Sequence, residues 1–107
     1  TIEDQDLPTK YPIRDKTIFE LLYATGVRCS ELVNIRLCDV DMTNKTIRIL
    51  GKGNKERMVF FGEKAKEKIE LYFAHERCEQ KRQDEPLFLN YRREKLTPRT
   101  VQRIVEL

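Results

Sequence analysis

The sequence lacks the residues and patterns on which several classes of protein depend. It has one histidine, His75, and its three cysteines show no Cys-x-x-Cys spacing, so neither a zinc site nor a disulfide framework is expected. No apolar run approaches the roughly 20 residues needed to cross a bilayer, and the first residues show no signal-peptide pattern. No Gly-x-x-x-x-Gly-Lys-Ser/Thr loop is present, which argues against a nucleotide site of that type. These absences predict a cytoplasmic protein with reduced thiols, no metal and no membrane contact.

Charged residues, by contrast, are abundant and unevenly placed. They make up 36% of the 107 residues, against 39% hydrophobic residues, which is enough apolar material for the modest core of one domain. Residues 1–43 hold 5 basic and 8 acidic side chains, whereas residues 44–58 hold 5 basic and 1 acidic, and residues 77–107 hold 8 basic and 5 acidic. The net charge is only +3, but its concentration in the last two segments predicts that they face phosphate groups.

The spacing of apolar residues predicts an α+β fold that is mainly helical and has a small three-stranded antiparallel sheet. Strands are expected at residues 40–42, 46–50 and 57–61, with Lys52 at the end of a strand or in its turn. Residues 1–12 contain two prolines and are expected to be an extended leader or linker remnant. Four helices are expected: from about residue 13 to just before Arg28 with Gly26 as a left-handed C-cap, from Ser30 as N-cap through Leu32 and Ile35, over residues 63–82, and after Thr97-Pro98.

Two short motifs carry the chemical signal. Residues 24–32 read Ala-Thr-Gly-Val-Arg-Cys-Ser-Glu-Leu and contain Arg28, and residues 51–57 read Gly-Lys-Gly-Asn-Lys-Glu-Arg and contain Lys52. A guanidinium grips two phosphate oxygens at once and stays protonated, and a lysine ammonium can serve as a proton donor. Alone, an arginine after a glycine is usually a solvated side chain, and such a turn is usually an ordinary hairpin tip. Their order and spacing together are far more specific.

Together the motifs resemble the first half of the active site of the tyrosine recombinases, the phage-integrase and Xer-type family. The similarity is strongest over residues 18–62 and continues to residue 107, which implies that residues 13–107 are the N-terminal part of a recombinase catalytic domain. It implies that Arg28 binds the scissile phosphate, that Lys52 is the general acid toward the 5′-oxygen, and that Glu31 supports Arg28 and its helix. No metal or nucleotide cofactor is implied. DNA-backbone contacts are expected from Lys55, Arg57, Arg99 and Arg103.

The rest of the family's catalytic set has no counterpart in these residues. No His-x-x-Arg box is present, and none of the four tyrosines follows one. Tyr23 and Tyr72 are expected to be core residues, Tyr11 lies beside prolines, Tyr91 falls in a basic turn, and His75 is expected on the surface of a long helix. We therefore expect a piece of a recombinase that holds no nucleophile and cleaves nothing alone.

The resemblance also sets the expected activity and partners of the parent protein. The parent would carry out site-specific DNA recombination and integration through a 3′-phosphotyrosyl intermediate, with double-stranded DNA and other recombinase protomers as partners. The piece alone is expected to bind duplex DNA weakly and to self-associate through apolar surface that the missing helices would cover.

Two alternatives remain open. The chain could be a non-catalytic DNA-binding relic of an integrase, which differs from the first reading only in what the gene encodes after Leu107. It could instead be a charged protein-interaction domain whose basic hairpin is incidental. Salt-dependent affinity for DNA would separate the interaction domain from the other two.

Overall fold

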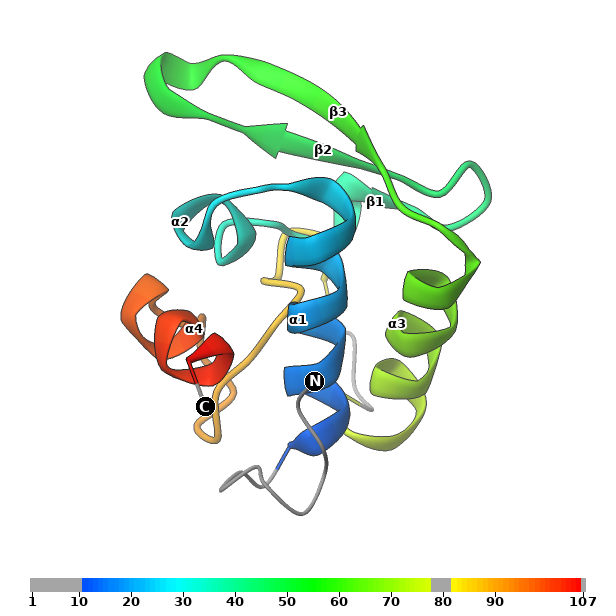
Figure 1. The fold of residues 1–107 in the computed structure, drawn as a ribbon, viewed down its shortest axis with the longest axis vertical. Helices are drawn as coiled ribbons and strands as arrows, with labels where there is room; N and C mark the ends of the chain where they lie inside the picture. Colours follow the sequence, from blue (N-terminus) through cyan, green and yellow to red (C-terminus); the bar gives the residue numbers. More distant parts are fainter. Residues whose placement is uncertain (1–10, 78–81, 107) are drawn as a thin grey trace.

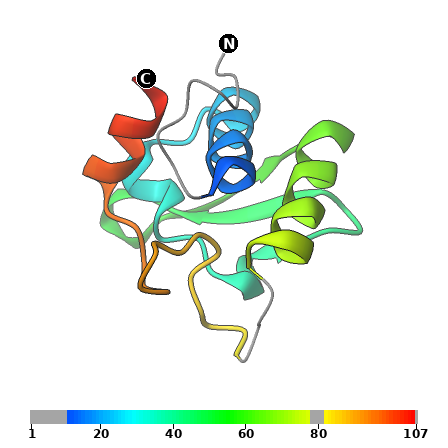
Figure 2. The same ribbon diagram turned by 90° about the horizontal axis from the view of Figure 1, so that it is seen from below.

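The computed structural model describes residues 11–77 and 82–106, and it confirms the expected α+β fold. Helix α1 lies between α3 and α4, and the antiparallel sheet lies across one end of these helices (Figures 1 and 2). The expected leader lies outside the described residues apart from Tyr11 and Pro12, and Pro12 is already the first residue of α1. The elements, in order, are α1 Pro12–Thr25, α2 Cys29–Leu32, η2 Leu37–Asp39, β1 Val40–Asp41, β2 Thr46–Leu50, η3 Lys52–Asn54, β3 Glu56–Phe60, α3 Glu63–His75 and α4 Pro98–Val105.

The sheet is three-stranded and antiparallel, as the sequence predicted, and has the order β1-β2-β3. Each strand begins and ends within one residue of its expected position. The register of the sheet places Ile47 opposite Val40 and Ile49 opposite Arg57. Because side chains alternate between the two faces of a strand, Ile47 and Ile49 are buried while Arg48 is exposed. The hairpin is therefore fixed to the core by one face of β2, and its tip extends beyond the helices (Figure 1).

The core forms where α1 meets α3 and where α2 meets α4. Tyr72 of α3 is 2% exposed, and its hydroxyl accepts the N–H of Leu89 at 3.1 Å. This placement confirms the structural reading of that tyrosine, and burial raises the pKa of its hydroxyl above the ordinary value. The other buried residues of the cluster include Ile18, Leu21, Leu32, Ile35, Ile69, Leu87, Phe88, Val101 and Ile104.

Helix α3 is shorter than predicted, because it ends at His75 and not near residue 82. The carboxylate of Glu76 accepts the N–H groups of Ile13 and Arg14 at 3.0 and 2.7 Å, which satisfies two free donors in the first turn of α1. The next side chain, Arg77, is 1% exposed and donates to the carbonyl of Leu87 at 3.1 Å. These long-range contacts replace the next helical turn, and residues 78–81 lie outside the described part of the chain.

Tyr23 was also predicted wrongly, because it is 85% exposed and not part of the core. The buried stripe of α1 passes through Ile18 and Leu21, which are 0% and 1% exposed. Two residues beyond Leu21 the helix has turned by about 200°, so Tyr23 points away from that stripe. No helix among the described residues is long and apolar enough to cross a bilayer.

Gly26 ends α1 in the left-handed conformation, and we expect its replacement by alanine to destabilise the fold. Its φ is 70°, and its N–H donates to the carbonyl of Leu22 at 3.0 Å. An added Cβ would meet nothing within 4 Å, so the cost lies in the backbone and should be about 1–2 kcal/mol. Urea unfolding should show a smaller loss for Gly26→Asn, because asparagine tolerates this conformation. Equal losses for the two variants would contradict this account.

Candidate active-site cleft

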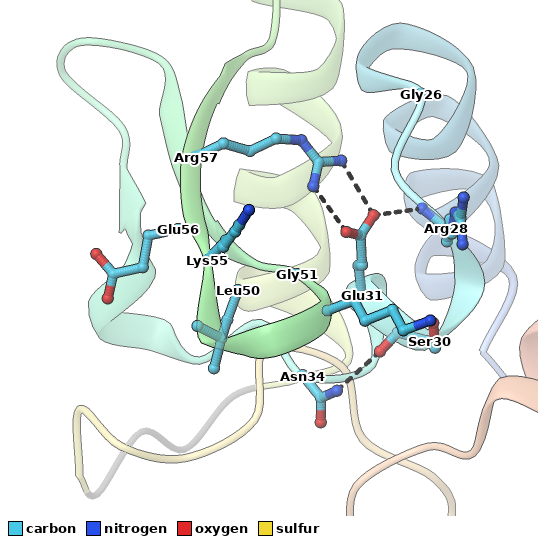
Figure 3. A pocket seen from close by; sticks show the side chains of 11 residues that line it. Gly26, Arg28, Ser30, Glu31, Asn34, Leu50, Gly51, Lys55, Glu56 and Arg57 are labelled. Atoms are coloured by element: carbon cyan, nitrogen blue, oxygen red, sulfur yellow. Dashed lines mark hydrogen bonds and ion pairs between the residues drawn. The ribbon is translucent and has the colours of Figure 1, made fainter.

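A cleft of about 710 Å³ opens between the end of α1, the start of α2 and the hairpin of β2 and β3 (Figure 3). It gathers the five residues of the two motifs for which a catalytic, supporting or DNA-contacting role was predicted. Its lining consists of Gly26, Arg28, Ser30, Glu31, Asn34, Leu50, Gly51, Lys52, Lys55, Glu56 and Arg57.

Arg28 lies at the junction between α1 and α2 in extended conformation, with φ of −81° and ψ of 157°. It is itself the N-cap of α2, so the prediction that Ser30 would cap this helix was wrong. The reason is that the Glu31 side chain reaches back and accepts the Arg28 N–H at 2.9 Å, which starts the helix at Cys29. The Arg28 side chain is exposed, and within residues 11–77 and 82–106 its guanidinium has no hydrogen bond or ion pair.

Glu31 is held by two groups at once. Its carboxylate accepts two hydrogen bonds from the Arg57 guanidinium, at 2.7 and 3.0 Å, in addition to the backbone N–H of Arg28. Only 13% of its side chain is exposed. The hydrogen bonds from Arg57, and after them the one from Arg28, lower the pKa of Glu31 from 4.5 to about 2. Glu31 is therefore ionised at any ordinary pH.

Lys52 stands in the turn between β2 and β3, as predicted. The turn is tight because Gly53 and Asn54 both adopt positive φ, 73° and 59°, which glycine and asparagine tolerate best. The N–H of Gly51 donates to the carbonyl of Lys55 at 2.8 Å and closes the turn. Lys52 and Lys55 are both exposed and, like Arg28, have no ion-pair partner in the described part of the chain.

Arg99 and Arg103 lie apart from the cleft lining, on α4. As predicted, Thr97 caps this helix, and its hydroxyl oxygen accepts the N–H of Thr100 at 3.2 Å. The two arginines are one helical turn apart and both are exposed. Helix α4 packs beside α2, the helix that Arg28 caps.

The pairing of Glu31 with Arg57 was missed from the sequence, which predicted Arg57 as a phosphate contact. One feature of the sheet indicates this pairing. Arg57 is opposite the buried Ile49 in the ladder, so the two share the face that is turned toward the helices. Asn34 was also missed as a lining residue, and its side chain donates to the carbonyl of Ser30 at 2.8 Å.

Comparison with known proteins gives consistent matches. The model of the phage integrase family matches residues 3–107. Tyrosine recombinase XerC of Staphylococcus epidermidis is 45% identical over 96 residues, which are 90% of this chain and 32% of that protein. Tyrosine recombinase XerC of Staphylococcus aureus is 42% identical over 105 residues, which are 98% of this chain and 34% of that protein.

Two solved structures have the same fold. The crystal structure of XerA recombinase superimposes with a TM-score of 0.77 at 31% identity, over 87% of this chain and 33% of that one. The structure of XerH site-specific recombinase bound to a palindromic difH substrate, a post-cleavage complex, gives 0.76 at 25% identity, over 98% and 30%. This chain thus spans about a third of the length of the relatives it matches. The match over almost the whole chain shows that it belongs to the phage integrase family, the tyrosine recombinases.

Proposed function

We propose that this chain is the N-terminal part of the catalytic domain of a site-specific DNA recombinase. The full-length protein would cut and rejoin DNA strands through a 3′-phosphotyrosyl intermediate and so take part in DNA integration and recombination. One observation carries this proposal: Arg28, Lys52 and Lys55 line a single cleft, and no ion pair joins any of them to a carboxylate of the described residues. A cluster of free cations in a cleft is suited to a phosphodiester.

In the proposed reaction, the guanidinium of Arg28 binds the scissile phosphate and stabilises the charge that gathers on its non-bridging oxygens. A tyrosine hydroxyl attacks the phosphorus and loses its proton to a base of the remainder of the protein, the bond from phosphorus to the 5′-oxygen breaks, and the Lys52 ammonium gives its proton to the departing oxygen. The tyrosine, and the His-x-x-Arg box that the family places before it, would come from the remainder of the protein. The cleft described here would then be the half of the site that receives the phosphate and protonates the leaving group.

The proposed partners are duplex DNA and, in the full-length protein, other recombinase protomers. The DNA-bound XerH structure supports the first of these, since it has the same fold over 98% of this chain. We assign contacts to phosphates other than the scissile one to Lys55, Arg99 and Arg103, which are exposed. Such contacts set the position of the protein on DNA and do not read its sequence.

Affinity for duplex DNA should fall steeply as salt rises, which tests the proposed function in this chain. The logarithm of the binding constant should fall linearly with the logarithm of salt concentration, by about 0.9 for each phosphate neutralised. Fluorescence anisotropy with a labelled duplex should show this slope reduced by about 0.9 in Lys55→Gln. Lys64→Gln is the matched control, because Lys64 is an exposed lysine on α3 outside the cleft lining.

Two results would contradict the assignment. If the chain had no measurable affinity at low salt, it would not be a DNA-binding piece, and the protein-interaction alternative would stand. If Lys64→Gln reduced the slope as much as Lys55→Gln, binding would follow net charge alone and the cleft would have no special part in it.

A further inference from the structure

The Glu31 carboxylate bridges the two motifs that carry the proposed catalytic residues. Its Oε1 accepts the backbone N–H of Arg28 at 2.9 Å and an Nη2–H of Arg57 at 3.0 Å, and its Oε2 accepts from Nη1 of Arg57 at 2.7 Å. Figure 3 shows the carboxylate between the helix start and strand β3. A single side chain therefore links β3 to the junction between α1 and α2, where Arg28 lies.

The same pair also packs against the residue that precedes Lys52. A Cβ added to Gly51 would lie 3.3 Å from Oε2 of Glu31 and 3.6 Å from Nη1 of Arg57. The Gly51 backbone has φ of −93°, so the glycine is needed for the space it leaves and not for its conformation. The Glu31–Arg57 pair is thus in close contact with the backbone next to each of the two proposed catalytic residues.

Lys55 and Arg57, the two residues of the hairpin that were predicted to contact DNA, differ in whether they already have a partner. Lys55 has no partner in the described part of the chain, whereas both terminal nitrogens of Arg57 are already used by Glu31. The other charged residues of the cleft lining, Lys52, Lys55 and Glu56, make no hydrogen bond to Glu31. Bidentate pairing fixes the direction as well as the distance between two groups.

We propose that Arg57 is a positioning residue that clamps the hairpin carrying Lys52 to the helix start carrying Arg28, and that it is not a phosphate ligand. This inference rests on the proposed function, because it assigns Arg57 a role in aligning the two catalytic groups. Transfer of a proton to the leaving oxygen requires Lys52 and the phosphate held by Arg28 to keep one relative position. A free hairpin tip would lose that alignment without losing either group.

The clamp can be tested by nuclear magnetic resonance, with the Arg28 amide as the reporter. Because this N–H donates to Glu31, its chemical shift should follow the ionisation of that carboxylate. In the wild-type chain the shift should stay constant from pH 6 down to about pH 3, since the pKa of Glu31 is lowered from 4.5 to about 2. In Arg57→Gln it should titrate at a clearly higher pH than in the wild type, because the largest cause of the lowered pKa of Glu31 is removed and only the weaker contribution of Arg28 still lowers it. In Lys55→Gln the profile should be the same as in the wild type. A flat profile in Arg57→Gln would overturn the clamp.

A second variant covers the case in which Arg57→Gln does not fold. Arg57→Lys keeps the positive charge but offers no planar fork, so one of the two hydrogen bonds is lost. We expect the Arg28 amide to titrate in this variant too, with a midpoint between those of the wild type and Arg57→Gln. A profile identical to the wild type would show that charge alone holds Glu31, which would overturn bidentate clamping.

The salt dependence of DNA binding separates positioning from phosphate contact. If Arg57 is a clamp, Arg57→Gln should leave the salt slope nearly unchanged, whereas Lys55→Gln should reduce it by about 0.9. An equal reduction in both variants would make Arg57 a phosphate ligand and overturn the proposal. If the chain failed to bind DNA at all, the proposed function would fail, and the amide titration would still decide whether the clamp exists.

Discussion

Replacing Arg28 with alanine in a full-length recombinase that contains this chain is expected to abolish measurable strand cleavage and to leave most of the DNA affinity. The guanidinium of Arg28 is exposed in the cleft and unpaired among the described residues, so it is available to a phosphate. Its contact gains strength as charge develops in the transition state, and loss of such a group lowers the rate by about 10³-fold or more. Single-turnover formation of the covalent protein–DNA complex measures the rate, and anisotropy measures the affinity.

The matched control for this variant is Arg82→Ala. Arg82 is also an exposed arginine, but it pairs with Asp84 at 3.0 Å and lies outside the cleft lining. Because Arg82→Ala removes the same charge from the protein at a position outside the cleft lining, cleavage should stay near the wild-type rate. Wild-type cleavage by Arg28→Ala would refute the catalytic assignment, and a parallel loss of affinity and rate would make Arg28 a ground-state contact only.

The local structure at Arg28 and at Lys52 could be predicted because each depends on neighbouring residues, whereas a site shared by the two was implied by the resemblance to the recombinases. Gly26 ends α1 two residues before Arg28, and the Gly-Lys-Gly-Asn-Lys segment forms a turn wherever two strands flank it. The ion pair of Glu31 with Arg57 joins residues 26 positions apart. It depends on how the sheet packs against the helices, and that packing is set by the core as a whole.

The errors in the fold have the same origin. The apolar stripe that predicted a helix over residues 63–82 ends at Phe73, and the helix ends at His75, where Glu76 binds the start of α1 and Arg77 binds the carbonyl of Leu87. Local propensity is a weak signal where tertiary contacts compete with it. The strands were predicted to within one residue because short β-branched or aromatic runs and the turn residues between them define each strand locally.

Lys52→Ala in the same full-length recombinase should slow cleavage by about 10²- to 10⁴-fold, the usual contribution of a general acid. The departing 5′-oxygen is a poor leaving group unless it is protonated. A substrate in which sulfur replaces that oxygen leaves as a thiolate and needs no proton, so it should restore much of the rate in the variant. Cleavage of the two substrates by Lys52→Ala and by the wild type, measured under single-turnover conditions, provides the four rates required.

The comparison with Lys55→Ala makes this result specific. Lys55 lies in the same hairpin and is exposed in the same cleft, but it is proposed to contact a phosphate other than the scissile one. Its removal should therefore slow both substrates by the same factor, because a backbone contact does not depend on which atom leaves. If Lys52→Ala also slowed both substrates equally, Lys52 would not be the proton donor. Rescue of Lys52→Ala alone would assign the proton to Lys52 and not to Lys55, the other lysine of the cleft lining.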